Sequence, residues 1–259
     1  MLTNCLPAQL SSIILGTFNS IPCPPIVLRL LPAADEIPPE KILKTPYTLL
    51  HRRECTQLQK YRLPKRRSEY LTGRICAKMA MSDYLHLTLQ DPPEMNQIEI
   101  KNSEYGQPFI TSHQSVSSPM PYISISHSSG YGAAVAAQHR CGIDIQRQEN
   151  SLIKVREKYC LEDDYRIVSR IIPEGGELLG LSLLWSAKEA IQKRFSSEDN
   201  MPTFLNICLQ DGERKGNDNV LFYFSIPPSQ GRQDTRIITV AAGVFMNYAI
   251  AVSAHKENI

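Results

Sequence analysis

The residues best suited to chemistry are one aspartate and one glutamate that stand in different kinds of predicted element. Asp144 lies in "GIDIQ", whose alternation predicts a β-strand, and Glu189 lies in "WSAKEAIQK", whose spacing predicts a helix. Two carboxylates in one cleft repel each other and are costly to desolvate unless a cation offsets their charge. Oxygen ligands with no histidine or cysteine alongside suit Mg²⁺, which keeps several waters and takes further ligands from phosphate. The two motifs together therefore predict an Mg²⁺ site that serves a phosphate-bearing ligand.

The predicted strand sorts its residues onto two faces. With a period of two, Gly142, Asp144 and Gln146 share one face. Ile143 and Ile145 share the other face. Aspartate is unfavourable inside a strand, so its face is either open to water or holds a partner for the carboxylate. Judged on the strand alone, a half-solvated strand explains the pattern as well as a metal site does.

The predicted helix also permits two interpretations. Trp185, Glu189 and Lys193 fall on one stripe at helical spacing. A glutamate and a lysine four residues apart commonly form a solvated ion pair that contributes only a few tenths of a kcal/mol. On spacing alone this surface pair is the more common arrangement, and only the aspartate motif shifts the balance toward chemistry. The apolar stripe of the same helix has three members: Leu184, Ala187 and Ile191.

A basic segment supplies the charge that a phosphate needs. Residues 52–78 hold nine lysines or arginines and two glutamates, a local excess of seven positive charges in a chain of formal net charge +2. Such a segment is also typical of a solvated helix face or a nucleic-acid patch. Only Tyr61 and Tyr70 lie within it as aromatic residues, so a stacking platform for single strands is the weaker interpretation. A phosphate-rich small ligand or an acidic protein partner explains the segment as well.

His127 in "SISHSSG" is a third candidate. A histidine among serines in a predicted turn is more often a hydrogen-bonded structural residue than a ligand contact. The residue types around His127 leave both interpretations open.

Composition describes an ordinary globular protein. The chain has 259 residues, of which 42% are hydrophobic and 21% charged, and its near-neutral total gives no global attraction for nucleic acid or an anionic membrane. Its seven cysteines are odd in number and scattered, which favours reduced thiols. The first 28 residues lack a basic n-region, and no stretch reaches the apolar length of a membrane span. We therefore expect a cytoplasmic protein with no membrane and no nucleic-acid partner.

The elements that must position these residues mix helices and strands. The spacing predicts a long helix over residues 65–85, and "QIEIKNSEYGQPFI" predicts a strand, a turn and a second strand. The break at "QHRC" predicts a hairpin that joins the strand before it to "GIDIQ". Helices then follow, including "WSAKEAIQK", and the tail returns to strands. Two mixed α and β halves are the expected architecture.

Three motifs in chain order carry a family resemblance. "SISHS", "GIDIQ" and "WSAKEAIQK" resemble the motifs of the 4′-phosphopantetheinyl transferases of the surfactin and enterobactin type. Upstream, "KRRSEYLTGR" is similar to the basic arginine helix of the enterobactin branch, and "YGQP" is similar to the YGKP turn of the surfactin branch. The ordered set, spread over residues 65–195, is far more specific than any single motif.

The resemblance implies an α+β fold with a pseudo-twofold arrangement of two similar α+β subdomains and the active site in the cleft between them. It implies an N-terminal subdomain at residues 1–140, with the basic helix and the SHS turn, and a C-terminal subdomain at residues 141–259, with the GIDIQ strand and the WSAKE helix. The implied reaction moves the 4′-phosphopantetheine arm of coenzyme A onto a serine of an acyl or peptidyl carrier protein and releases 3′,5′-ADP. The nucleophile then belongs to an acidic, transiently docked partner, which explains why the chain shows none of its own. A monomer, with Mg²⁺ or Mn²⁺ as cofactor, is also implied.

The resemblance also implies residue roles around the metal. Asp144, Gln146 and Glu189 would bind Mg²⁺, and Glu189 would act as general base toward the serine, directly or through a water. Lys193 would contact the pyrophosphate and complete a catalytic set with Asp144 and Glu189. Lys188 matches the motif as a further coenzyme A contact or as part of an ion pair.

Other implied contacts come from the first half of the chain. Ser126 and His127 would contact the 3′-phosphate region of coenzyme A. Arg67 and Arg74 would neutralise its phosphates.

Two residues depart from the family pattern. Gln146 replaces a third acidic metal ligand, and Gln107 replaces the lysine of the YGKP turn. The main rival interpretation is therefore a module that binds coenzyme A and carrier protein with weak or no turnover.

Overall fold

The computed structural model describes residues 26–33, 49–111, 120–173, 176–195, 201–215, 219–228 and 235–254. The described residues form a mixed α and β structure that divides into two compact units, with the boundary between His139 and Arg140. We call the first unit 1 and the second unit 2.

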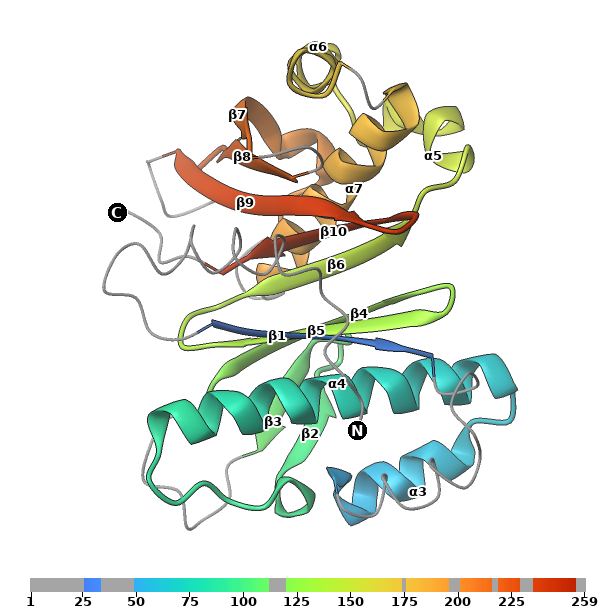
Figure 1. Ribbon diagram of the computed structural model, residues 1–259, viewed down its shortest axis with the longest axis vertical. Coiled ribbons are helices and arrows are strands. Elements are labelled where there is room, and N and C mark those ends of the chain that lie inside the picture. The colour runs from blue at the N-terminus through green and yellow to red at the C-terminus, as the bar shows by residue number, and fades with distance from the viewer. Residues whose placement is uncertain are drawn as a thin grey trace. The chain divides into compact units, whose positions relative to one another are not determined.

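The described residues of unit 1 form a strand, two α-helices, a 3₁₀ turn and two hairpins (Figure 1). Strands β1, β5 and β4 form an antiparallel sheet in that order, β2 and β3 form a separate pair, and β3 also lies against β4. The elements run as follows: β1 (Ile26–Pro32), α3 (Arg52–Lys60), α4 (Pro64–Thr88), η2 (Met95–Gln97), β2 (Glu99–Asn102), β3 (Pro108–Thr111), β4 (Tyr122–Ser128) and β5 (Tyr131–Ala137).

Unit 2 has one five-stranded antiparallel sheet in the order β6, β10, β9, β8, β7. Its elements run as follows: β6 (Gly142–Arg147), α5 (Ser151–Lys154), η3 (Arg156–Lys158), α6 (Glu162–Ile171), α7 (Gly176–Arg194), η5 (Phe204–Asn206), β7 (Cys208–Arg214), β8 (Asn219–Ile226), β9 (Arg236–Phe245) and β10 (Tyr248–Ser253).

One long helix covers the sheet in each unit. Helix α4 packs on β5, β1 and β4 (Figure 1). It approaches β4 closely at Gly73, where an added Cβ would lie 3.0 Å from the Ile125 side chain. A Cβ at position 73 would therefore meet a single side-chain methyl group, which can shift by a few tenths of an ångström. Helix α7 packs on β6, β10 and β9, and its predicted apolar residues Leu184, Ala187 and Ile191 are fully buried in the core of unit 2.

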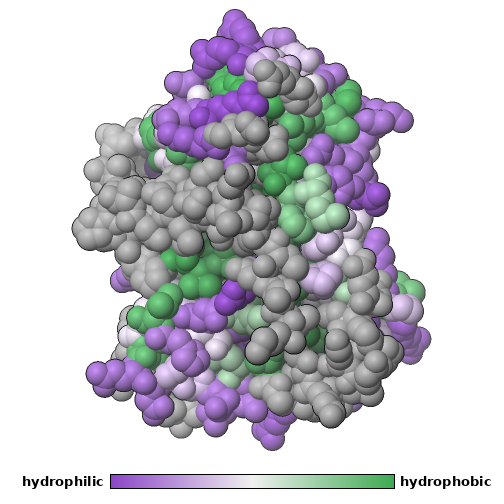
Figure 2. All heavy atoms as spheres, in the orientation of Figure 1, coloured by the Kyte–Doolittle hydropathy of each residue, from purple (hydrophilic) through white to green (hydrophobic). Residues whose placement is uncertain are grey.

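Helix α6 is amphipathic. It turns Asp164, Val168 and Ile171 inward and exposes most of its other charged side chains, and Figure 2 shows the hydrophilic surface that results over this helix.

The two units repeat one order of elements. Each has a first strand, a short helix (α3 or α6), a long helix, a 3₁₀ turn and two hairpins, and unit 2 adds α5 and η3 before α6. In each unit the first strand pairs with the last strand, which pairs with the strand before it. Side chains repeat as well. Cys76 Sγ in α4 donates to the carbonyl of Gly132 at 3.3 Å, and Ser186 Oγ in α7 donates to that of Ala249 at 3.4 Å. Gly132 and Ala249 are both the second residue of the last strand in their unit.

An ion pair between the first strand and the long helix also repeats, with its charges reversed. In unit 1, Arg29 of β1 pairs with Asp83 of α4. In unit 2, Asp144 of β6 pairs with Lys193 of α7, with 2.7 Å between Nζ and Oδ1. Arg29 and Asp144 each lie opposite the fourth residue of the last strand, which is an alanine in both units.

The structure corrects two expectations. The predicted hairpin at "QHRC" is wrong, because β5 belongs to the sheet of unit 1 and β6 to that of unit 2. Strand β5 already has β1 on one side and β4 on the other, so β6 has no edge of β5 on which to pair. His127 lies inside β4, and the turn comes after it at Ser129 and Gly130.

The described part of the chain also shows the lengths of the helices and the state of the cysteines. None of its helices combines the length and apolarity needed to cross a membrane. Its five cysteines, Cys55, Cys76, Cys141, Cys160 and Cys208, are free thiols.

Candidate active site

Strand β6 presents Asp144 to helix α7. The strand lies so close to the helix that a Cβ on Gly142 would come within 1.8 Å of the carbonyl oxygen of Ala190. Only glycine, which has no Cβ, fits this approach. Asp144 is 5% exposed and Ile143 and Ile145 are fully buried, so both faces of β6 are covered and the half-solvated strand is wrong.

Three of the predicted site residues converge in unit 2. Lys193 Nζ lies 2.7 Å from Asp144 Oδ1, which links the helix motif to the strand motif across 49 residues of sequence. Burial raises the pKa of Glu189, Lys193 opposes that rise and Asp144 adds to it. Glu189 is half-buried, so it is not the fully solvated member of a surface ion pair. A carboxylate with a raised pKa, a second carboxylate and a lysine in mutual electrostatic contact are typical of a functional site.

Gln146 lies two residues beyond Asp144 at the end of β6. It is half-buried, and its Nε2 donates to the carbonyl of Arg147 at 2.8 Å. Among the described residues, no group of three or more His, Cys, Asp or Glu is placed to hold a metal ion. A cation bound by Asp144 and Glu189 would therefore need an amide, water or ligand oxygens, which suits Mg²⁺.

Unit 1 contributes a pocket of about 360 Å³. Arg74 and His127, both predicted phosphate contacts, line it together with Gly73 and with Gly106 of the "YGQP" turn. The guanidinium of Arg74 lies 5.0 Å above the ring of Tyr70, and its Nη2 donates to Asn102 Oδ1 at 2.7 Å. Arg74 is held rigidly in a concave, partly aromatic wall and can pair with an anion there.

A second hollow of about 470 Å³ adjoins this pocket, with Arg53, Lys60 and Lys101 in its wall. The two hollows share four of their lining residues: Tyr61, Tyr70, Arg74 and Asn102. The basic segment thus borders continuous concave surface on unit 1.

Comparison with known proteins places the chain in a family. The model of the 4′-phosphopantetheinyl transferase N-terminal domain matches residues 56–137, from α3 to the end of β5. The holo-[acyl-carrier-protein] synthase of Staphylococcus carnosus is 30% identical over 95 residues, which are 37% of this chain and 78% of that protein. The holo-[acyl-carrier-protein] synthase of Geobacillus kaustophilus is 34% identical over 109 residues, which are 40% of this chain and 78% of that protein. This chain belongs to the phosphopantetheinyl transferase superfamily.

A solved structure resembles part of this phosphopantetheinyl transferase. The holo-(acyl-carrier-protein) synthase of Bacillus anthracis, crystallised in complex with coenzyme A (3′,5′-ADP), is 23% identical and matches 44% of this chain and 94% of that one, with a TM-score of 0.37.

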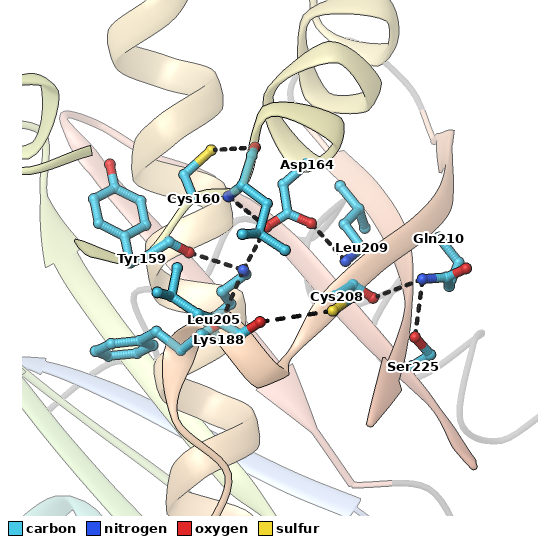
Figure 3. Close-up of polar contacts among 11 residues, drawn as sticks. Tyr159, Cys160, Asp164, Lys188, Leu205, Cys208, Leu209, Gln210 and Ser225 are labelled. Carbon is cyan, nitrogen blue, oxygen red and sulfur yellow. Dashed lines mark hydrogen bonds and ion pairs between the residues drawn. The ribbon is translucent and has the colours of Figure 1, made fainter. Parts of the chain in front are cut away.

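Lys188 of this transferase is not placed for ligand binding. It is 0% exposed, and its ammonium donates to the carbonyl of Tyr159 at 2.8 Å, Asp164 Oδ2 at 2.6 Å and the carbonyl of Phe204 at 3.1 Å. Figure 3 shows its side chain directed toward Asp164 and Tyr159. The predicted coenzyme A contact at Lys188 is therefore wrong, and the ion-pair alternative is confirmed.

Two other predicted residues stand outside the lining of the 360 Å³ pocket. Ser126 is buried and, as the neighbour of His127 in β4, points to the opposite face of the strand. Arg67 is exposed on α4, while Arg66 lines the pocket of the transferase.

Sequence reasoning missed Arg66, although a signal for it was present. Arg66, Tyr70 and Arg74 are spaced four apart, so they share one helical face, which is the face that lines the pocket. The same period places Arg67 about 100° away around the helix. Asn102, from β2, had no such signal.

Proposed function

We propose that this phosphopantetheinyl transferase moves the 4′-phosphopantetheine arm of coenzyme A onto a serine hydroxyl of an acyl or peptidyl carrier protein and releases 3′,5′-ADP. The observation that carries the proposal is the 2.7 Å ion pair between Asp144 Oδ1 and Lys193 Nζ, whose charges also act on the pKa of Glu189. The relatives support the choice of substrate, because they are holo-[acyl-carrier-protein] synthases.

Mg²⁺ is part of the proposal, held by Asp144 and Glu189 with a further oxygen from Gln146. When bound, the ion would offset the pyrophosphate charge and the charge that develops on the departing 3′,5′-ADP. The fit rests on donor chemistry, since carboxylate and amide oxygens are hard ligands and the two acids lie in one electrostatic cluster.

Glu189 would accept the proton of the carrier serine, directly or through a water. Burial raises the pKa of Glu189 in the metal-free protein, and a bound cation would favour its ionised form, which is the form that can accept the serine proton. The serine oxygen would bond to the phosphorus that carries the pantetheine arm as the bond from that phosphorus to the ADP oxygen breaks. The ammonium of Lys193 would offset negative charge on the pyrophosphate.

The phosphates on the nucleotide side of coenzyme A are assigned to the pocket of unit 1. Arg74 and His127 line it, and Arg66 adds a positive charge at its wall. Within the same proposal, the N-terminal subdomain ends at residue 140. The two subdomains are related by the pseudo-twofold axis that the family resemblance implies, with coenzyme A in the cleft between them. The repeated order of elements in the two units supports two similar subdomains.

The test incubates the protein with coenzyme A, Mg²⁺ and a panel of apo-carrier proteins and measures carrier mass. A gain of one phosphopantetheine arm on the carrier serine is expected. Asp144→Ala and Glu189→Gln should each abolish the gain, whereas Glu94→Gln, a matched change at an exposed glutamate, should keep it. No gain on any carrier, with coenzyme A still bound, would instead identify a binding module without turnover.

A further inference from the structure

A buried cluster ties α7 to three other parts of unit 2. We define the Lys188 cluster as Lys188 and Asp164 with the backbone groups they contact. Lys188 reaches the carbonyls of Tyr159 and Phe204, and Asp164 accepts from the backbone N–H of Leu209 at 2.7 Å (Figure 3). Asp164 also accepts from the backbone N–H of Leu161 at 3.1 Å. One ion pair therefore joins α7 to the start of α6, the η5 turn and strand β7.

The Lys188 cluster fixes how α7 is rotated about its axis. Trp185, one turn before Lys188, packs on the ring of Tyr159 at 4.8 Å and on that of Phe204 at 5.0 Å. Tyr159 and Phe204 thus hold α7 twice, by their rings and by their carbonyls. Glu189 follows Lys188 directly, and one residue of helix is about 100° of rotation. The direction of Glu189 is consequently set by the cluster.

Unit 1 contains the counterpart, which we call the Lys78 cluster. Lys78 Nζ lies 3.1 Å from Glu54 Oε2 and donates to the carbonyls of Met95, at 2.8 Å, and Ile98. Glu54 accepts from the backbone N–H of Ile100 at 3.0 Å, as Asp164 does from a strand of unit 2.

The Lys78 cluster lies next to the pocket of unit 1. Glu54 Oε1 is also 3.9 Å from the Nε of Arg74, the pocket residue one turn before Lys78. Burial lowers the pKa of Lys78, and Glu54 opposes that fall. The carboxylate therefore holds both the buried lysine and the pocket arginine.

Stability alone does not explain such clusters. A buried ion pair gains little over well-packed apolar side chains of the same volume, because desolvation offsets the attraction between the charges. A charge that accepts or donates several directed hydrogen bonds does, however, define position more narrowly than apolar contacts do. In both units the cluster lies beside a residue of the proposed site.

We propose that Lys188 and Asp164 are positioning residues that orient Glu189 toward Asp144, and that Lys78 and Glu54 do the same for Arg74 in the pocket of unit 1. This inference rests on the proposed function, in which Glu189 serves the metal and the transfer step and Arg74 serves coenzyme A binding.

The test compares two matched double variants. Lys188→Met with Asp164→Asn removes the buried charges of unit 2 and keeps side-chain volume, and Lys78→Met with Glu54→Gln does so in unit 1. Mn²⁺ binding is measured by electron paramagnetic resonance, coenzyme A binding without metal by calorimetry, transfer by carrier mass, and folding by circular dichroism.

A crossed pattern is expected. The unit 2 variant should lose about 10- to 100-fold in Mn²⁺ affinity and kcat, the usual effect of displacing a metal ligand's support, while its coenzyme A affinity stays within about threefold. The unit 1 variant should weaken coenzyme A by about 10-fold or more and keep Mn²⁺ affinity and kcat at saturating coenzyme A. Equal losses in all readouts for both variants would overturn the inference. So would an unchanged Mn²⁺ affinity in the unit 2 variant or an unchanged coenzyme A affinity in the unit 1 variant.

Lys188→Arg gives a second route if a double variant does not fold. It keeps the charge but places a larger planar group in the cluster, which displaces α7. Reduced Mn²⁺ affinity at undiminished coenzyme A affinity supports the inference, and unchanged Mn²⁺ affinity contradicts it. If the wild-type protein binds Mn²⁺ and coenzyme A but modifies no carrier, the proposed function is refuted. The binding measurements on the variants then still test the positioning role. A wild type that binds neither refutes both.

Discussion

Gly142→Ala should damage both the stability of unit 2 and its candidate site. The new Cβ would lie 1.8 Å from the Ala190 carbonyl oxygen, whereas real Cβ contacts do not fall below 3.0 Å, so β6 and α7 must separate by about 1.2 Å. The opposing atom belongs to backbone, which cannot turn aside as a side chain can. We therefore expect the upper range for overpacking, about 3 kcal/mol, which for a chain of this size lowers Tm by about 6 to 12 °C.

The same displacement should lower activity. Asp144 is carried by β6, and Glu189 and Lys193 by α7, so a separation of the two elements stretches the 2.7 Å contact between Asp144 and Lys193. A misplacement of about 1 Å in a catalytic arrangement typically lowers the rate by about 100-fold. Thermal melts by circular dichroism and initial rates of carrier modification measure the two effects.

Gly73→Ala is the matched control for stability. Its Cβ would meet only the Ile125 side chain, at 3.0 Å, and alanine favours a helix by about 1 kcal/mol over glycine. We expect a Tm within about 4 °C of wild type for this variant. If the Tm of Gly142→Ala also lay within that range, the close approach of β6 to α7 could not be what requires glycine at position 142.

Three further predictions concern the site. Burial raises the pKa of Glu189 in the folded state. Its ionisation therefore costs stability as the pH rises from the pKa of the unfolded chain through the raised pKa of the folded one. Without metal, Glu189→Gln should have a higher Tm than wild type at about pH 8, and this gain should be lost near pH 3.5. Gln146→Glu should raise Mn²⁺ affinity by roughly tenfold, and an unchanged titration would mean that position 146 does not face the ion. Arg74→Ala should raise the coenzyme A Kd by about 10-fold or more, while calorimetry of Arg67→Ala should show a change below about threefold.

The sequence was sufficient where local pattern decides structure. The alternation of "GIDIQ" predicted β6, and helical spacing predicted the buried stripe of α7, because both periods follow from backbone geometry. The need of Asp144 for a partner could be predicted as well, since a buried carboxylate inside a strand is costly without one, but its pairing with Lys193 was found only in the structure.

The sequence was insufficient where distant partners decide structure. The hairpin at "QHRC" looked local, but β1, more than a hundred residues earlier, occupies the edge of β5 that it required. The pairing of Lys188 with Asp164 spans 24 residues and an intervening helix end, and no short-range period encodes it. For the same reason a motif lysine was interpreted as a ligand contact when its acceptors are buried protein oxygens.

The reversed ion pair shows that the two units can carry opposite charges at equivalent positions of a similar backbone. In an assembly of identical subunits, each position carries the same residue in every copy, so a charge that suits one copy is imposed on all of them. Here the same position opposite the last strand holds Arg29 in one unit and Asp144 in the other, and the residue after the buried lysine is Met79 in one and Glu189 in the other. The chain thus breaks the equivalence of its own halves at single positions while their backbones keep one plan.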